Sequence, residues 1–403
     1  MSIETLTDTI LSKMSDVGKW QRDFLRHLFR LALSFRGKFN FLNMERQGCY
    51  NELTYRQNFE RSFNWLAFNF ELIMAYTLPE RIVVFDPSYV SKSGKFTPGV
   101  GWHWSGCSGA PKWGLEIGAF SVVDIVNHTA LHLVADQTLA EKVQQSGSLL
   151  AYYGDLVLEK ADELLKISNF LVCDAYFSRN PFVDKVRQSG LHLITRLRDD
   201  AAMRYPYLGP QKEGRGRDKT FAGKVDVRHL DKRHFSPCAV GDEGEKAFEA
   251  KLYVNSWKCW AKVVVVHQYN TQGEIKSVKV YASTLTTIPG ADLWLYYQAR
   301  FQSEFLFRDA KQHTGLEHSQ SRKTEALDYH FNTALSAVSI AKALHWLSLP
   351  AEQRGPFSMA DIKTQYFNEL MLERFFSAYG LNPHRAKNNP AYKSLYEFGK
   401  IAA

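Results

Sequence analysis

The sequence predicts an α/β protein built on a mixed sheet with flanking helices, preceded by a helical region and interrupted by a β-rich insertion. Three observations lead to this prediction. The first 78 residues show helical periodicity, whereas short apolar runs bounded by turns begin at about residue 79. Between residues 200 and 288 a polar, basic stretch is followed by further strand-like runs. At 403 residues the chain has room for two or three domains.

Residues 1–78 are predicted to form a helical region. Apolar residues at spacings of four, four and three share one helix face: Trp20, Phe24, Leu28 and Leu31. A row of arginines occupies another face: Arg22, Arg26 and Arg30. A solvated surface is the alternative interpretation of this row. Because basic and aromatic residues continue as far as Trp65, we expect the row to form a phosphate-contacting surface.

Residues 79–199 read as the order β-β-β-α-β-α-β, which is a meander of three strands joined to later strands through helices. The predicted strands are Ile82–Phe85, Leu115–Ile125, Thr129–Val134, Phe170–Cys173 and Leu191–Leu197. Asp86 and Asp174 each follow a short apolar run, where the last side chain of a strand can face a crevice. Each is therefore a candidate for chemistry, with a turn cap as the alternative.

Residues 200–288 are predicted to form a β-rich insertion subdomain. Its first half is basic and loop-like and includes Arg215 and Arg217. Its second half is strand-like over Lys251–Val254, Ala261–His267 and Val278–Ala282. Helical periodicity returns over 289–347, and 348–403 is a mixed C-terminal region for which DNA contact or dimerisation is expected.

The formal net charge is +8 and the sequence pI is about 9.0. The excess is clustered, because the segments Lys19–Arg61 and Arg204–Arg233 each carry a net charge of +5. A clustered positive charge indicates a polyanionic partner.

Several function classes are not expected. No apolar run approaches the roughly 20 residues that cross a bilayer, and the N-terminus lacks a basic and an apolar export segment, so we expect a cytoplasmic protein without a membrane contact. The five cysteines are scattered without a C-x-x-C pair. Ser91–Lys95 only partly matches a phosphate-binding loop, so no nucleotide cofactor is expected.

One predicted helix, Leu293–Lys311, concentrates functional groups. At about 100° per residue, offsets of 0, 3, 7 and 14 place Tyr297, Arg300, Glu304 and Lys311 within roughly 60° of one another. By itself this arrangement could also be a solvated charged face.

The spacing of these four residues matches the Y-(2)-R-(3)-E-(6)-K signature of the DDE transposases grouped around insertion sequence four. The chain resembles that family over most of its length, including the segments Phe85–Tyr89, Lys112–Glu116, Gly315–His318 and Phe331–Ala343. The resemblance implies a ribonuclease-H-like catalytic domain. In such a domain the first two acids lie on adjacent strands, the third lies on a later helix, and a β-rich insertion separates the second from the third.

The resemblance also implies a chemistry and a set of residues. Asp86, Asp174 and Glu304 would be catalytic and would bind two Mg²⁺ ions, with Mn²⁺ able to substitute, because in-line attack on a phosphodiester needs an activated oxygen and a stabilised leaving group. Tyr297, Arg300 and Lys311 would contact DNA phosphates. Trp257 and Trp260 would stack on a base extruded near the cut, unless they are core residues of the insertion.

The expected function is cut-and-paste transposition: cleavage at terminal inverted repeats and strand transfer into target DNA by a homodimer at the bacterial nucleoid. Two alternatives stay open. A catalytically silent DNA-binding derivative would keep the fold without cleavage, and a ribonuclease-H-like nuclease would cleave without strand transfer.

Overall fold

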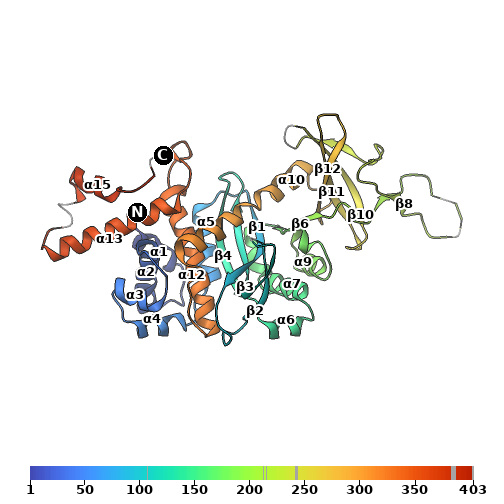
Figure 1. The fold of residues 1–403 in the computed structure, drawn as a ribbon. Helices are drawn as coiled ribbons and strands as arrows, with labels where there is room; N and C mark the ends of the chain where they lie inside the picture. Colours follow the sequence, from blue (N-terminus) through green and yellow to red (C-terminus); the bar gives the residue numbers. More distant parts are fainter. Residues whose placement is uncertain (107, 212, 215, 241–243, 383–386, 402–403) are drawn as a thin grey trace. The chain divides into compact units, whose positions relative to one another are not determined.

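A computed structural model describes residues 1–106, 108–211, 213–214, 216–240, 244–382 and 387–401 (Figure 1). The predicted mixed α/β architecture with an N-terminal helical region is confirmed. The chain divides into two compact units. Unit 1 comprises Met1–Pro79, Pro87–Leu139 and Ser303–Ala403, and unit 2 comprises Glu80–Asp86 and Ala140–Gln302.

The N-terminal part of unit 1 is a set of helices: α1 (Ile3–Leu11), α2 (Lys19–Ser34), α3 (Phe41–Gln47), α4 (Glu52–Phe59) and α5 (Trp65–Tyr76). Side-chain caps begin four of them, at Ser2, Asn40, Asn51 and Asn64, each accepting a backbone N–H of the first turn. The apolar face predicted for α2 is buried at Phe24 and Leu28, whereas Trp20 is largely exposed.

The strands β2 (Gly101–Ser105), β3 (Ala110–Asp124) and β4 (Thr129–Gln137) of unit 1 form an antiparallel ribbon with β3 in the middle. Residues 87–91 of β1 (Arg81–Ser91) also belong to this unit. Strand β2 was not predicted, since Gly-Trp-His-Trp-Ser contains no aliphatic run and alternates between exposed and half-buried positions. Its pairing with β3 stabilises it instead.

The C-terminal part of unit 1 is helical: α11 (Gln302–Asp309), η2 (Ala310–Thr314), α12 (Thr324–Lys342), η3 (Ala343–Leu347), η4 (Ala351–Gln353), α13 (Met359–Ala378) and α15 (Pro390–Tyr396). Helix α12 is almost wholly buried and packs on β4. Asn332 of α12 binds both backbone groups of Ala135 in β4, accepting from its N–H at 2.9 Å and donating to its carbonyl at 3.0 Å. This amide fixes the helix against the strand.

Unit 2 begins with residues 81–86 of β1, which pair in parallel with β5 (Phe170–Val172), and β5 pairs in parallel with β6 (His192–Leu197). The helical elements of this part are α6 (Ala140–Ser146), α7 (Leu149–Glu159), α8 (Ala161–Ile167), η1 (Ala175–Phe177) and α9 (Phe182–Gln188). A strand meander followed by strands connected through helices is consistent with the expected ribonuclease-H-like fold.

The insertion lies wholly within unit 2. Its strands are β7 (Met203–Pro206), β8 (Phe221–Lys224), β9 (Ser236–Cys238), β10 (Glu245–Val254), β11 (Cys259–Tyr269) and β12 (Ile275–Ser283). Strand β12 pairs antiparallel with β6, and the order continues β12-β11-β10-β7-β8, with β9 on β10. The insertion therefore extends the sheet of unit 2. Helix α10 (Gly290–Ala299) then packs on β6, β11 and β12.

Among the residues described, no helix combines the length and the apolar character needed to cross a membrane.

We predict that Asn332→Leu lowers the free energy of unfolding by about 2–5 kcal/mol, because the near-isosteric leucine leaves the N–H and the carbonyl of Ala135 without their buried partner. Urea denaturation followed by circular dichroism measures the loss. The exposed Asn388→Leu is the matched control, and equal stability of the two variants would contradict the role given to Asn332.

We also predict that stability falls as the pH is lowered from 6.5 toward 4. Burial lowers the pKa of His132 and of His330 to about 4, so in this window the unfolded chain binds protons that the folded chain does not. The free energy of unfolding measured at successive pH values should show a shallower slope in His330→Gln than in the wild type. An unchanged slope in that variant would contradict the prediction.

Candidate active site on strands β1 and β5

The parallel register of β1 and β5 places Asp86 and Asp174 at equivalent positions in unit 2. Val83 pairs with Leu171 and Val84 with Val172, so each aspartate lies two residues beyond a paired valine. Side chains alternate along a strand, and the two carboxylates therefore leave neighbouring strands in the same direction. The apolar runs before them are fully buried, whereas both aspartates are half-buried. The predicted strand end at Asp86 is wrong, because β1 continues through Asp86 to Ser91, whereas Asp174 lies beyond the end of β5 at Val172.

Local hydrogen bonds fix the second aspartate. Its carboxylate accepts the backbone N–H of Tyr176 at 3.0 Å, which makes Asp174 the cap of η1 as well as a strand-end acid. The hydroxyl of Thr195 on β6 donates to the Asp174 carbonyl at 2.6 Å. The sequence left a turn cap and a chemical role as alternatives for this residue, and its position is compatible with both.

Several charged groups lie close enough to the buried thiol of Cys173 to shift its pKa. Burial raises the pKa of Cys173 well above its usual value, Asp174 and Asp86 raise it further, and Arg300 lowers it. Two carboxylates and one guanidinium thus act on the same point in unit 2. Arg300 is the second residue of the predicted Y-R-E-K set.

Tyr297, the first residue of that set, belongs to the same cluster. Burial raises the pKa of its phenol, with Asp174 adding to the rise and Arg300 opposing it. The Arg300 guanidinium lies 5.9 Å from the centre of the Tyr297 ring, and the ring of Tyr281 lies 4.8 Å away. Because its pKa is raised, the phenol keeps its proton at neutral pH and can donate a hydrogen bond.

The single helix predicted over Leu293–Lys311 is wrong. Helix α10 ends at Ala299 and α11 begins at Gln302. Between them the chain tightens, because the N–H of Arg300 bonds the Tyr297 carbonyl and that of Phe301 bonds Gln298, three residues back in each case. The angular positions expected for Tyr297, Arg300, Glu304 and Lys311 assumed one continuous helix. They therefore do not hold across this turn.

Glu304 and Lys311 lie in unit 1. Glu304 is half-buried in the first turn of α11, and Lys311 lies in η2. The Lys311 ammonium donates to the Tyr89 carbonyl at 2.7 Å and lies 3.9 Å from the Glu317 carboxylate. The chain passes from unit 2 to unit 1 at residue 303, so the four signature residues are divided between the two units.

The two aspartates fit a divalent metal ion in donor type. Carboxylate oxygens on adjacent strands are hard ligands of the kind Mg²⁺ prefers. Within either unit, no three described His, Cys, Asp or Glu residues form a group that could hold a metal ion. Asp86 and Asp174 are thus two candidate ligands in unit 2.

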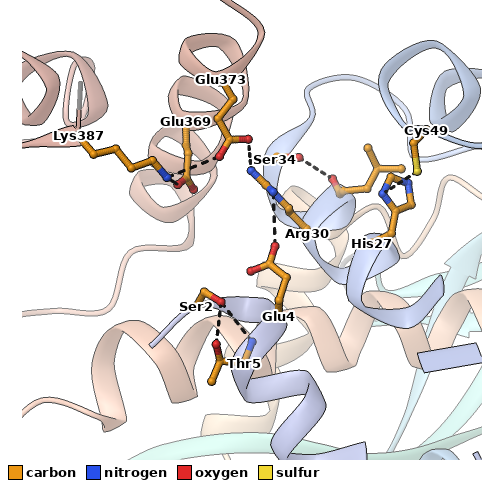
Figure 2. A network of polar contacts seen from close by, with 11 residues as sticks. Ser2, Glu4, Thr5, His27, Arg30, Ser34, Cys49, Glu369, Glu373 and Lys387 are labelled. Carbon is orange, nitrogen blue, oxygen red and sulfur yellow. Dashed lines mark hydrogen bonds and ion pairs between the residues drawn. The ribbon is translucent and has the colours of Figure 1, made fainter. Parts of the chain in front are cut away.

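The predicted arginine row on α2 is engaged within unit 1, and Figure 2 shows the partners of Arg30. Arg30 forms ion pairs with Glu4 of α1, at 3.5 Å, and with Glu373 of α13. Lys387 binds Glu369 at 3.0 Å and lies 3.6 Å from Glu373, so the acids of α13 are shared.

The other two arginines of the row also have partners in unit 1. Arg26 bonds Asp8 at 2.9 Å and also Asp23, and Arg22 donates to the carbonyls of Val17 and Met14. These contacts tie α2 to its neighbours and favour a structural role for the row over a phosphate-binding one.

The insertion residues differ in their surroundings. Trp257 is fully buried and its indole N–H donates to the Ser178 carbonyl at 2.9 Å, so its ring packs in the core of unit 2 and is closed to a DNA base. Trp260 is half-buried, 5.5 Å from the Tyr253 ring and 5.9 Å from the Phe221 ring. Arg217 is exposed in the basic loop, and Arg215 lies outside the described residues.

Sequence reasoning missed two neighbours of this site. Arg196 of β6 and Tyr281 of β12 both act on the Tyr297 phenol. The only signal for Arg196 was a lone cation within the apolar run Leu193–Leu197. Tyr281 lies in a strand of the insertion, and its position depends on the pairing of β12 with β6.

Carboxylates can bind divalent metal ions, and a guanidinium and a protonated phenol can bind a phosphate, so this cluster offers the groups that metal-assisted chemistry on a phosphodiester requires. Residues 151–339 match the sequence model of the family described as Transposase DDE domain. The match supports a DDE transposase, a class of enzyme whose substrate is DNA. It covers Asp174 and all four signature residues, while Asp86 precedes it. A search of curated proteins gave no match.

We predict that Trp257→Ala lowers the free energy of unfolding by about 3–5 kcal/mol, because it removes a fully buried ring and leaves a cavity. Trp260→Ala is the matched control and should cost less, since this ring is only half-buried. Urea denaturation measures both variants. Equal losses would contradict the core position assigned to Trp257.

Proposed function

We propose that the chain is a cut-and-paste DDE transposase in which Asp86, Asp174 and Glu304 form the catalytic acid triad. The observation that carries this proposal is the shared register of Asp86 and Asp174 on adjacent parallel strands. The Transposase DDE domain match over residues 151–339 supports it, as does a carboxylate at Glu304 within the match. The Y-R-E-K spacing favours the group around insertion sequence four.

The three acids would hold two Mg²⁺ ions, which Mn²⁺ could replace. When bound, such ions supply charge that activates an attacking oxygen and stabilises a leaving one. The buried runs before the two aspartates and the bond from the Thr195 hydroxyl to the Asp174 carbonyl would hold the backbone of both residues in place. This arrangement would present the scissile phosphate to a water molecule first and to a DNA 3′-hydroxyl afterwards.

Tyr297 and Arg300 would contact the DNA backbone near the cut. The guanidinium can neutralise a phosphate, and the phenol, whose pKa burial raises, keeps a proton to donate to a phosphate oxygen. Lys311 would act in the same way from unit 1, after exchanging its present bond to the Tyr89 carbonyl for a phosphate. Arg217 of the basic loop and Trp260 stay candidates for DNA contact.

We also propose the domain organisation that the sequence indicates. Residues 79–199 and 289–347 would form the catalytic domain, with the insertion at 200–288 and the C-terminal region at 348–403. The enzyme would bind terminal inverted repeats and target DNA as a homodimer, in a bacterial cytoplasm and at the nucleoid. Residues 1–78 would contribute to DNA binding through residues other than the three engaged arginines.

We predict that Asp86→Asn, Asp174→Asn and Glu304→Gln each reduce Mg²⁺-dependent strand cleavage by about a thousandfold or more, because loss of one carboxylate removes several kcal/mol of transition-state stabilisation. The substrate is a plasmid carrying the two ends of the element that encodes this chain. Asp184→Asn, a partly exposed acid of α9, and Glu325→Gln, an exposed acid of α12, are the matched controls and should cleave normally.

End binding is measured alongside by gel shift and should persist in all variants. Cleavage at the wild-type rate by any triad variant removes that residue from the site. A joining assay with a pre-cut 3′-hydroxyl end separates the rivals: a nuclease cleaves without joining, and a silent derivative does neither.

A further inference from the structure

A basic pocket of about 630 Å³ lies in unit 1 between the loop that follows β1 and the loop that precedes α12. Its lining contains Lys38, Lys92, Lys95 and Arg322, together with Glu317. The Ser91–Lys95 segment, which resembles a nucleotide-binding loop only in part, forms one wall. The sequence alone gave this segment no role.

Two of the charged groups build the pocket. Lys92 donates to the carbonyls of Ser319 at 2.7 Å and Ser321 at 2.9 Å, which ties the two loops together. Glu317 lies 3.5 Å from the Ser91 N–H and 3.9 Å from the Lys311 ammonium. The pocket wall thus adjoins Lys311, the last residue of the Y-R-E-K set.

The other three cations face solvent. Lys38, Lys95 and Arg322 are exposed, and none of them forms an ion pair with a described residue. Like charges around one hollow repel each other, and an anion bound among them relieves that repulsion. The pocket is therefore suited to a phosphate group.

A row of tryptophans adjoins this pocket. In the β2–β3 ribbon Trp102 pairs with Trp113 and Trp104 pairs with Pro111, so the three indoles share one face of the ribbon. Trp102 is 70% exposed, Trp104 62% and Trp113 39%. We call these three residues the tryptophan ribbon. The indole N–H of Trp113 donates to the carbonyl of Gly94 at 3.0 Å, and Gly94 lines the basic pocket.

Large exposed aromatic clusters mark binding sites, because exposure of indole rings to water is unfavourable and a bound ligand covers them. Aromatic faces beside unpaired cations match the two parts of a nucleic-acid strand, since bases stack on rings and phosphates bind cations. A duplex hides its base faces, so an open tryptophan favours unpaired bases. The charge of the neighbouring pocket favours DNA over a second copy of this chain.

We propose that the tryptophan ribbon and the basic pocket together bind a DNA strand whose bases are unpaired, with bases on Trp102 and Trp104 and phosphates at Lys38, Lys95 and Arg322. This inference rests on the proposed function, which makes DNA the substrate. It adds to that function a strand-binding surface beside Lys311 and outside the acid triad. Such a surface would hold an opened strand that leaves the cleavage site.

The test is fluorescence anisotropy with a labelled 12-nucleotide oligo-dT and the full chain, in EDTA so that no cleavage occurs. Trp102→Ala/Trp104→Ala should weaken binding at least tenfold, because each stacked base contributes about 1–3 kcal/mol, or roughly 5- to 150-fold. Val126→Ala, which trims an apolar side chain that is 55% exposed in the turn between β3 and β4, is the control and should bind like the wild type.

The charge part of the surface is tested by Lys95→Ala/Arg322→Ala. This variant should bind oligo-dT more weakly. The slope of log K against log salt should also be smaller by about 1.4, because each of the two phosphates that the protein no longer neutralises contributes about 0.7 to the slope. Lys142→Ala, an exposed lysine of α6, should leave the slope unchanged. Circular dichroism confirms that each variant is folded.

Oligo-dT affinity that is unchanged in both double variants overturns the inference. A tryptophan variant that instead shifts from dimer to monomer in ultracentrifugation, with unchanged oligo-dT affinity, also overturns it and assigns the ribbon to a second copy of the chain. Because this assay needs no cleavage, its outcome is separate from that of the triad variants: weakened strand binding supports the surface even if the triad proposal fails.

Discussion

The parallel pairing of β1 with β5 is the constraint on which the candidate active site depends. It sets Asp86 and Asp174 at the same level of adjacent strands, and a slip of one residue would turn either carboxylate to the opposite face. The pairing is firmly specified, because Ile82–Phe85 and Leu171–Cys173 are fully buried and cannot shift without exposing apolar surface. Buried apolar strands thus position the two aspartates.

Other elements of unit 2 contribute residues to the candidate site beside β1 and β5. Strand β6 supplies the Thr195 hydroxyl that holds the Asp174 backbone, and β12 places Tyr281 against Tyr297. The end of α10 delivers Arg300 into the same electrostatic environment. Since β12 belongs to the insertion and pairs with β6, the insertion has a structural part in the site in addition to its proposed DNA contacts.

The buried apolar runs and the acid that follows each of them could be predicted from the sequence, because buried parallel strands are continuous apolar runs. The end predicted for the first strand at Asp86 is wrong, since β1 continues to Ser91. The break between α10 and α11 could not, since no Gly or Pro marks it. The arginine row on α2 shows a second limit. Its periodicity is visible in the sequence, but its partners Glu4, Asp8 and Glu373 belong to other helices.

The two tryptophans of the insertion illustrate the same limit. They lie three residues apart and looked equivalent, yet Trp257 is buried and bonded to Ser178 whereas Trp260 joins a partly exposed aromatic cluster. The tryptophan ribbon escaped prediction for a related reason. Its indoles come together through the register of β2 with β3, and β2 has no aliphatic run from which the strand could be predicted.

The central claim is that Asp86, Asp174 and Glu304 converge on shared metal ions when DNA is bound. A crystal structure of the chain with end DNA and Mn²⁺, with anomalous scattering to locate the ions, tests it most directly. We expect anomalous peaks within about 2.0–2.3 Å of oxygens from all three carboxylates, in keeping with metal–carboxylate distances for ions of this size. Peaks bound by other residues, or a Glu304 carboxylate that touches neither ion, would contradict it.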